Sequence, residues 1–274
     1  MPKNAQSIRP FLKWAGSKFR IIDRIQRLLP PGKRLIEPFT GSGAVFLNTD
    51  YDHYLLSDNN PDLINLYRYL QEDGQAFIDY CKNYYFGDKF NNPDTYYKRR
   101  ELFNKTTDLR KKSALFLYLN RHGYNGLCRY NSSGGFNVPF GRYKHPYFPA
   151  KEMLAFHYKS QYAEFRVAGF ETVMQNAKRG DVIYCDPPYH PLSASANFTT
   201  YSAGGFSEAQ QHQLAALAKA ARERNIPVLI SNHNTRFTLD VYADATLENF
   251  PVRRFISCNG NRRDHAGELL ALYS

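Results

Sequence analysis

The stretch Arg34-Leu-Ile-Glu-Pro-Phe-Thr-Gly-Ser-Gly43 decides the fold of this chain. Residues 34–39 are typical of a short buried strand, and the strand runs directly into the glycine turn Thr40-Gly-Ser-Gly43. The glycines permit a tight turn and let a ligand approach the backbone closely. An apolar segment then begins at Ala44. The pattern is the start of a βαβ unit.

The same unit continues with a second short strand, Tyr54-Leu-Leu-Ser-Asp58, which ends in an acid. Asn60-Pro-Asp62 then opens a helix, with proline in the first turn. An acid that closes the second strand can accept hydrogen bonds from ribose hydroxyls. A Gly-x-Gly pair alone carries little information, but strand, glycine turn, helix, strand and acid in this order predict a nucleotide-type site.

A second motif, Asp186-Pro-Pro-Tyr189, directly follows the apolar, strand-like run Asp181-Val-Ile-Tyr-Cys185. The acid can accept hydrogen bonds, and the two prolines donate none and keep the backbone extended. The carbonyl of Pro187 can therefore point into a site, and Tyr189 offers a flat face for stacking. These groups can hold a planar ring by its exocyclic amino group and leave that nitrogen open to attack.

The remaining pattern predicts an α/β fold in two pieces. Residues 1–62 and 160–274 are expected to form one catalytic domain, into which a basic helical and loop module, residues 63–159, is inserted. Further expected elements are a mostly helical stretch at 63–120 that is most buried at 113–120, a loop-rich stretch from Gly123 to Pro149, a helix near Pro149, strands at 165–167, 182–186, 226–231 and 268–273, a helix at 207–224 that starts with a capping box, and a mobile loop at 192–205 over the site.

Composition limits the class of protein. The four cysteines among 274 residues are scattered and include no Cys-x-x-Cys pair, which argues against a zinc site or disulfides and fits a reducing cytosol. The histidines show no ligand spacing, so we expect no metal. No apolar run approaches the length of a membrane span, and the N-terminus lacks the core of a signal peptide. We therefore expect a cytoplasmic protein.

The net charge is +11, and residues 109–151 contain no Asp or Glu. Basic and aromatic side chains alternate there. Such a stretch suits a polyanion whose bases can be stacked upon, and equally suits a solvated face over core aromatics. The basic residues are Arg110, Lys111, Lys112, Arg121, Arg129, Arg142, Lys144 and Lys151, and the aromatic ones include Tyr124, Tyr130, Phe136, Phe140, Tyr143, Tyr147 and Phe148.

Several blocks together resemble a known family. In order, they are Phe11-Leu-Lys-Trp-Ala-Gly16 with Lys18, Glu37-Pro-Phe-Thr-Gly-Ser-Gly43, Asp58, Tyr124-Asn-Gly-Leu-Cys-Arg129 and Asp186-Pro-Pro-Tyr189. The chain closely resembles the DNA adenine-N6 methyltransferases of the Dam family, which modify the adenine of GATC, and the likeness runs from about Phe11 to Tyr273.

The resemblance implies a Rossmann-like methyltransferase sheet that binds S-adenosyl-L-methionine. On the residues alone, Trp14 is better explained as a core aromatic and Lys18 as a solvated charge. The family implies instead that Trp14 and Lys18 contact the cofactor, that Phe39, Gly41 and Gly43 line its pocket, that Asp58 accepts from the ribose, and that Asp186 stands between cofactor and target base, with Pro187 and Tyr189 as further catalytic residues.

The resemblance also implies double-stranded DNA as partner. Base flipping is then expected, because the N6 of an adenine inside a duplex is reached only when the base is flipped out. Tyr124 is expected to fill the gap in the stack, with Asn125 near the orphaned base, and Arg129 to read guanine. Leu127 and Pro139 either touch thymine methyls or pack the loop. Lys13 and Tyr143 match positions that touch the outer part of the site, and Arg142, Lys144 and residues 110–112 contact phosphates or solvent.

Two other functions stay open at this stage. One is methylation of another planar amine or amide, such as protein glutamine, RNA adenine or cytosine N4; those relatives tend to carry Asn or Ser where Asp186 stands. The other is a non-catalytic nucleic-acid-binding protein, against which the intact Trp14, Asp58, Asp186 and Tyr189 argue. We expect a monomer from a prokaryotic cell or from a virus that infects one.

Overall fold

The computed structural model describes residues 7–190, 206–252 and 266–274. The chain divides into two compact units. Unit 1 consists of Met1–Gln26, Thr40–Asp50 and Tyr54–Val167. Unit 2 consists of Arg27–Phe39, Tyr51–His53 and Ala168–Ser274.

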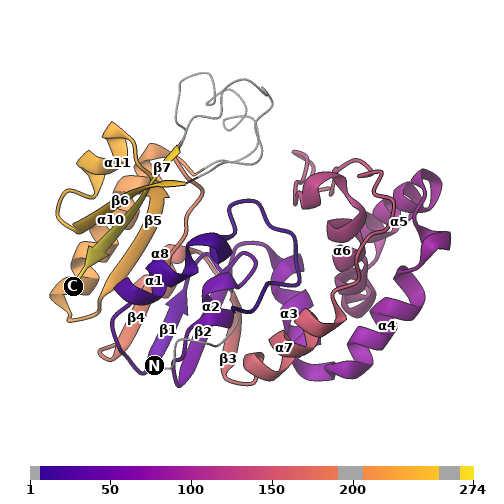
Figure 1. Ribbon diagram of the computed structural model, residues 1–274, viewed down its shortest axis with the longest axis horizontal. Helices are drawn as coiled ribbons and strands as arrows, with labels where there is room; N and C mark the ends of the chain where they lie inside the picture. The colour runs from indigo at the N-terminus through magenta and orange to yellow at the C-terminus, as the bar shows by residue number, and fades with distance from the viewer. Residues whose placement is uncertain (1–6, 191–205, 253–265) are drawn as a thin grey trace. The chain divides into compact units, whose positions relative to one another are not determined.

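Unit 1 is mainly helical. Its longest helices are α3 (Pro61–Asp73), α5 (Pro93–Lys105) and α6 (Leu109–His122). Helix α6 packs against α3 and α5, and its residues 113–120 are all buried. The other described elements that lie wholly or mostly in this unit are η1 (Lys18–Ile21), α1 (Ile22–Leu28), α2 (Ala44–Asn48), β2 (His53–Asp58), α4 (Gln75–Tyr85), η2 (Asp88–Phe90), η3 (Tyr124–Gly126), α7 (Ala150–Ser160) and β3 (Ala163–Val167) (Figure 1).

Helix α3 shows how local sequence starts an element. The Asn60 side chain accepts hydrogen bonds from the N–H groups of Asp62 and Leu63, at 3.0 and 3.3 Å. Pro61 lies in the first turn, where its missing N–H costs nothing. Helix α3 thus begins three residues after Asp58, the last residue of β2. Asp58 therefore lies between β2, which pairs with β3 in parallel, and the capped helix α3.

Unit 2 is an open sheet with helices. Its central strand β4 (Asp181–Cys185) is buried along its whole length and pairs in parallel with β1 (Arg34–Glu37) and β5 (Val228–His233). At the start of β4, Asp181 forms a bidentate ion pair with Arg34, at 2.9 and 2.7 Å. The other described elements are α8 (Phe170–Gln175), α10 (Glu208–Glu223), α11 (Arg236–Val241), β6 (Thr246–Val252) and β7 (Ala266–Tyr273).

The strand order among the described residues is β3-β2-β1-β4-β5-β7-β6, and β7 runs antiparallel to β5 and β6. The order reverses between β1 and β4: from β1 the numbering rises outward through β2 and β3 on one side, and on the other it continues from β4 to β5. In open α/β sheets, ligands bind at the carboxyl ends of the strands at such a reversal. Asp186 follows β4 there, and Phe39 lies two residues beyond β1.

The α/β fold class and the expected strands are confirmed, as is the capping box of Ser207 and Gln210 at the start of α10. Strand β6 was missed. Among the described strands it pairs with β7 alone, most of its residues are at least partly exposed, and it contains Pro251, which an edge strand tolerates. The two compact units have other boundaries than the predicted domains, so that division stays a prediction. The expected loop at 192–205 lies outside the described residues.

Candidate active site

Asp186, the acid of the predicted catalytic motif, is hydrogen-bonded by a side chain of β5. Ser231 Oγ donates a hydrogen bond to Asp186 Oδ1 at 3.0 Å, and the Tyr184 hydroxyl lies 3.0 Å from the same Oγ. Burial, and then the negative charge of Asp186, raise the pKa of Tyr184 well above its usual value. Tyr184 therefore stays protonated and can donate to Ser231. The chain of donors ends on the carboxylate and orients it.

Tyr189 is half-buried, and its ring meets the ring of His233 edge to face, with centroids 4.6 Å apart and an interplanar angle of 80°. Burial, followed by the charge of Asp186, raises the pKa of Tyr189. The side chain is therefore a neutral aromatic plane at ordinary pH. Pro187 is buried and Pro188 exposed. The roles predicted for Pro187 and Tyr189 stay predictions.

Phe39 belongs to an aromatic cluster within unit 2. Its ring stacks on Phe170 at 5.4 Å and 26°, and meets Phe206 edge-on at 5.6 Å. Phe206 also contacts Phe170, at 5.3 Å. Such a cluster can form one apolar wall of a pocket for a planar ring.

In unit 1, the structure brings Asp58 and Gly41 together. The Asp58 carboxylate accepts hydrogen bonds from the N–H groups of Asn60, at 3.0 Å, and Gly41, at 3.2 Å. Burial raises the pKa of Asp58, and these N–H groups act in the opposite direction. Both carboxylate oxygens are thus oriented by backbone and keep lone pairs with which to accept hydroxyl groups.

Trp14 lies against Gly41. A side chain at Gly41 would place its Cβ 2.8 Å from Trp14 Nε1, so only glycine fits there, and both Gly41 and Gly43 have positive φ, at 48° and 69°. Lys18 is buried, and its Nζ donates to the Gly16 carbonyl at 2.5 Å. Trp14, Gly41 and Asp58 therefore form one contiguous group.

The predicted DNA-contacting residues lie mostly on the loop of residues 123–143, called the 123–143 loop below. Bridges between Gly123 and Phe140 and between Tyr130 and Phe136 fold it back on itself. At the first turn of the loop, Asn125 has φ 53°. The Tyr124 N–H donates to the Pro139 carbonyl at 2.9 Å, and the Tyr124 side chain is 51% exposed. Leu127 is half-buried, whereas Pro139, Arg142 and Lys144 are exposed.

Three of the predicted DNA contacts meet at Tyr143. The Lys13 ammonium lies over the Tyr143 ring, 3.7 Å from the centroid. The Tyr143 hydroxyl accepts a hydrogen bond from the Asn125 N–H at 2.9 Å. Burial, and then the charge of Arg121, lower the pKa of Lys13 to about 8. Lys13 is therefore only partly charged at mildly alkaline pH.

Arg129 is exposed and braced by one neighbour. Its Nε donates to Asn137 Oδ1 at 2.8 Å, and the Asn137 N–H donates back to the Arg129 carbonyl at 3.1 Å. The flanking residues anchor the loop: Asn60 Nδ2 donates to Cys128 Sγ at 3.4 Å, and the Tyr130 hydroxyl to Asp62 Oδ2 at 2.8 Å. The Arg129 side chain thus stands out from a backbone tied to the start of α3.

Part of the basic stretch has another role. Arg110 Nε pairs with Asp73 at 2.9 Å, and Lys112 Nζ with Asp62 at 3.2 Å. Arg110 and Lys112 were expected to contact phosphates or solvent; each also pairs with an acid of α3, and contact with phosphate stays a prediction. Among the residues that the structure describes, no group of three His, Cys, Asp or Glu could hold a metal, and no helix could cross a membrane.

Several residues around the site were not predicted. Asn60, Asp62 and Tyr130 support the 123–143 loop, and Ser231 and Asn232 lie at the end of β5. A signal existed for β5, since the apolar strand ends in the polar run Ser231-Asn-His233, on the strand beside Asp186. Asn60 was recognised only as the start of a helix.

Known proteins resemble this chain over nearly its whole length. A family model described as D12 class N6 adenine-specific DNA methyltransferase matches residues 14–254. The chain is 53% identical over 266 residues to the DNA adenine methylase of Serratia marcescens, which covers 97% of this chain and 98% of the relative. It is 51% identical to that of Escherichia coli K12, over 97% and 95%, and 49% identical to that of Haemophilus influenzae, over 97% and 93%.

Proposed function

The chain belongs to the D12 class N6 adenine-specific DNA methyltransferases, and on that premise we propose that it methylates the adenine of GATC in duplex DNA with S-adenosyl-L-methionine as donor. The observation that carries the proposal is the oriented Asp186 carboxylate at the carboxyl end of β4, beside the neutral ring of Tyr189. An acceptor and a flat ring at that place suit a planar base with an amino group.

The proposed mechanism must make the N6 nitrogen of adenine more nucleophilic. Its lone pair is delocalised into the adenine ring, so it is a poor nucleophile. In our proposal the Asp186 carboxylate and the Pro187 carbonyl each accept one N6 hydrogen, and Tyr189 stacks on the base. The lone pair is then localised on one face, and the bound cofactor supplies an electrophilic methyl group there. Positioning and electrostatics account for most of the acceleration.

Several of the residues predicted to bind cofactor suit S-adenosyl-L-methionine. Asp58, with both oxygens oriented by backbone N–H groups, suits the two ribose hydroxyls. The Gly41 backbone, bare of a side chain, and the Trp14 ring beside it suit close contact with the cofactor, as do Lys18 and Gly43 in the same segments. Phe39, in its aromatic cluster, suits a planar base.

We further propose that the target adenine is flipped out, at a cost on the order of 3 kcal/mol. The exposed ring of Tyr124, held on a tight turn by its N–H bond to Pro139, suits the vacated space in the stack. Asn125, next in the chain, would meet the orphaned base. Residues 63–159 would thus act as the DNA-recognition part of the chain.

Sequence would be read by the exposed face of the 123–143 loop. Asn137 holds Arg129 through Nε, at 2.8 Å, and through Nη2, at 3.4 Å, and the exposed guanidinium would read a guanine edge when DNA binds. Pro139, exposed, suits a thymine methyl better than the half-buried Leu127 does. Lys13 with Tyr143 would contact the outer base pair, and Arg142 and Lys144 the phosphates. We expect a monomer in the cytoplasm of a bacterium, since the relatives named above are bacterial.

The test is methylation of duplex oligonucleotides with methyl-labelled cofactor, followed by digestion and identification of the modified nucleoside. We expect N6-methyladenine in a GATC duplex and none when its adenine is replaced. Label on cytosine, on RNA or on protein would contradict the proposal. So would the absence of any transfer by protein that binds the duplex.

A further inference from the structure

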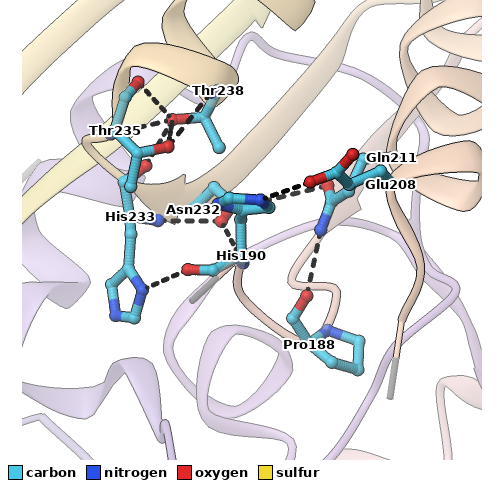
Figure 2. A network of polar contacts seen from close by, with 8 residues as sticks. All are labelled: Pro188, His190, Glu208, Gln211, Asn232, His233, Thr235 and Thr238. Atoms are coloured by element: carbon cyan, nitrogen blue, oxygen red, sulfur yellow. Dashed lines mark hydrogen bonds and ion pairs between the residues drawn. The ribbon is translucent and has the colours of Figure 1, made fainter. Parts of the chain in front are cut away.

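The backbone that follows Asp186 is held by buried side chains of two other elements, α10 and β5. Gln211 Nε2 donates to the Pro188 carbonyl at 3.1 Å, and the His190 N–H donates to Asn232 Oδ1 at 3.0 Å (Figure 2). The His190 carbonyl lies 2.8 Å from His233 Nδ1. Three contacts, at the Pro188 carbonyl and at the N–H and carbonyl of His190, thus hold the backbone of residues 188–190.

The two amides are linked to each other and to a tyrosine. Asn232 Nδ2 donates to Gln211 Oε1 at 3.1 Å, and the Tyr242 hydroxyl donates to the same oxygen at 2.6 Å. Burial raises the pKa of Tyr242, so its proton stays in place. Gln211, Asn232 and Tyr242 are each 0% exposed. We call these three side chains the clamp.

The backbone determines which way each amide points. A carbonyl only accepts, so Gln211 must present its NH2 group to Pro188. Asn232 Oδ1 faces the N–H groups of His190 and His233, which only donate, so its NH2 group must face Gln211. If either amide were rotated by half a turn, its NH2 group would face another hydrogen-bond donor, or its oxygen would face another acceptor. The clamp therefore has one arrangement, at the expense of burying polar groups that water would otherwise solvate.

This arrangement controls the carbonyl that the reaction needs. The Pro187 carbonyl belongs to the peptide plane between Pro187 and Pro188, and the ring of Pro188 restricts φ on the far side of that plane. Ser231 holds Asp186 before the plane, and Gln211 holds the Pro188 carbonyl after it. With both sides held, the plane has little freedom to rotate.

We propose that Gln211 and Asn232 are positioning residues for methyl transfer, which set the Pro187 carbonyl and the Tyr189 ring relative to Asp186. The proposal rests on the function proposed above. A misplacement of about 1 Å in a reacting geometry can cost about 100-fold in rate. The clamp does not touch the substrate, so its loss should lower kcat and leave the Kd for cofactor and DNA nearly unchanged.

The first test replaces Gln211 with Met, which keeps the volume and removes all three polar contacts of the side chain, to Pro188, Asn232 and Tyr242. We expect kcat to fall about 10- to 100-fold, with cofactor and duplex Kd close to wild type. The matched control is Asp181→Asn. Asp181 is also a buried polar residue, paired with Arg34, but it begins β4, ~16 Å of strand from Asp186. It should lower Tm and leave kcat unchanged.

The second test needs no large change of packing. In Gln211→Glu, the introduced carboxyl can donate to the Pro188 carbonyl while protonated and opposes it once ionised, and burial raises its pKa toward neutrality. Single-turnover rates are measured with labelled cofactor on a GATC duplex and divided by the fraction of protein that binds cofactor. The ratio of variant to wild type should fall as pH rises from about 6 to about 9.

The outcomes separate cleanly. A kcat loss in Gln211→Met no larger than that in Asp181→Asn, or a Gln211→Glu ratio that does not change with pH, would overturn the positioning role. A wild-type protein that leaves GATC adenine unmodified would overturn both this role and the proposed function. Active wild type with unaffected Gln211 variants would overturn the clamp alone.

Discussion

Two regions of the molecule are held in opposite ways. Residues 186–190 accept hydrogen bonds from, and donate them to, side chains of α10 and β5 that are 0% exposed. The 123–143 loop is also anchored, through Cys128 and Tyr130, but the side chains proposed to read DNA stand in solvent. The difference follows from the two tasks: bond-making needs one geometry in advance, whereas reading needs groups that stay accessible until DNA arrives.

The largest effect that this comparison predicts comes from the held region. Asp186→Ala removes the acceptor for an N6 hydrogen, and we expect methyl transfer to fall by about 10³-fold or more, while DNA binding largely survives. Turnover with labelled cofactor and duplex Kd are measured on the same preparation. Near-normal turnover in the purified variant would refute the mechanism.

The accessible region should lose selectivity before it loses turnover. We expect Arg129→Ala to relax the preference at one guanine by about 1–3 kcal/mol, because a bidentate contact to that base is lost. The measurement is kcat/KM on duplexes that carry each of the four bases at that position. An equal loss on all four duplexes would show instead that Arg129 contacts phosphate.

A smaller effect should appear with pH. Lys13 has a pKa of about 8, so it is cationic below that pH and neutral above it. We expect duplex affinity to fall as pH rises through about 8 and part of this dependence to vanish in Lys13→Gln. Duplex Kd from pH 7 to pH 9 at constant salt checks this. An identical profile in the variant would mean that the Lys13 charge contributes nothing to binding.

The smallest effect tests the anchor of the 123–143 loop. Tyr130→Phe removes the bond to Asp62, and we expect it to lower the free energy of unfolding by about 1 kcal/mol. Discrimination at the guanine should weaken less than in Arg129→Ala, with kcat on GATC retained. Tyr97→Phe, at a ring that is 43% exposed, is the control. Equal discrimination in both variants would show that the anchor does not affect reading.

Much of the site could be predicted because it follows chain order. Asp58 and Asp186 each end a short apolar run, and a run of that kind predicts a strand with an acid at its carboxyl end. Gly41 was predictable because the tight turn after β1 has positive φ, 48° at this residue, which glycine adopts readily. The helix at α3 was predictable from Asn60 and Pro61, because capping is a local interaction.

Other parts could not be predicted from local pattern. Strand β6 is largely exposed and contains Pro251, so it lacks the apolar run that revealed the other strands. Lys112 looks like a free cation in the sequence, but Asp62, 50 residues earlier, lies 3.2 Å from it. A lysine in solution and a paired lysine have the same letter, and only the fold distinguishes them.

The sequence by itself determined the order of strand, glycine turn and acid, the Asp186-Pro-Pro-Tyr189 motif and the basic stretch, because these depend on neighbouring residues. Only the tertiary structure decided that Gln211 and Asn232, 23 and 42 residues beyond the backbone groups they bind, hold the segment after Asp186. The physical reason is that a buried amide and an exposed amide are chemically identical. Which one acts is determined by the partners that folding brings within about 3 Å of it.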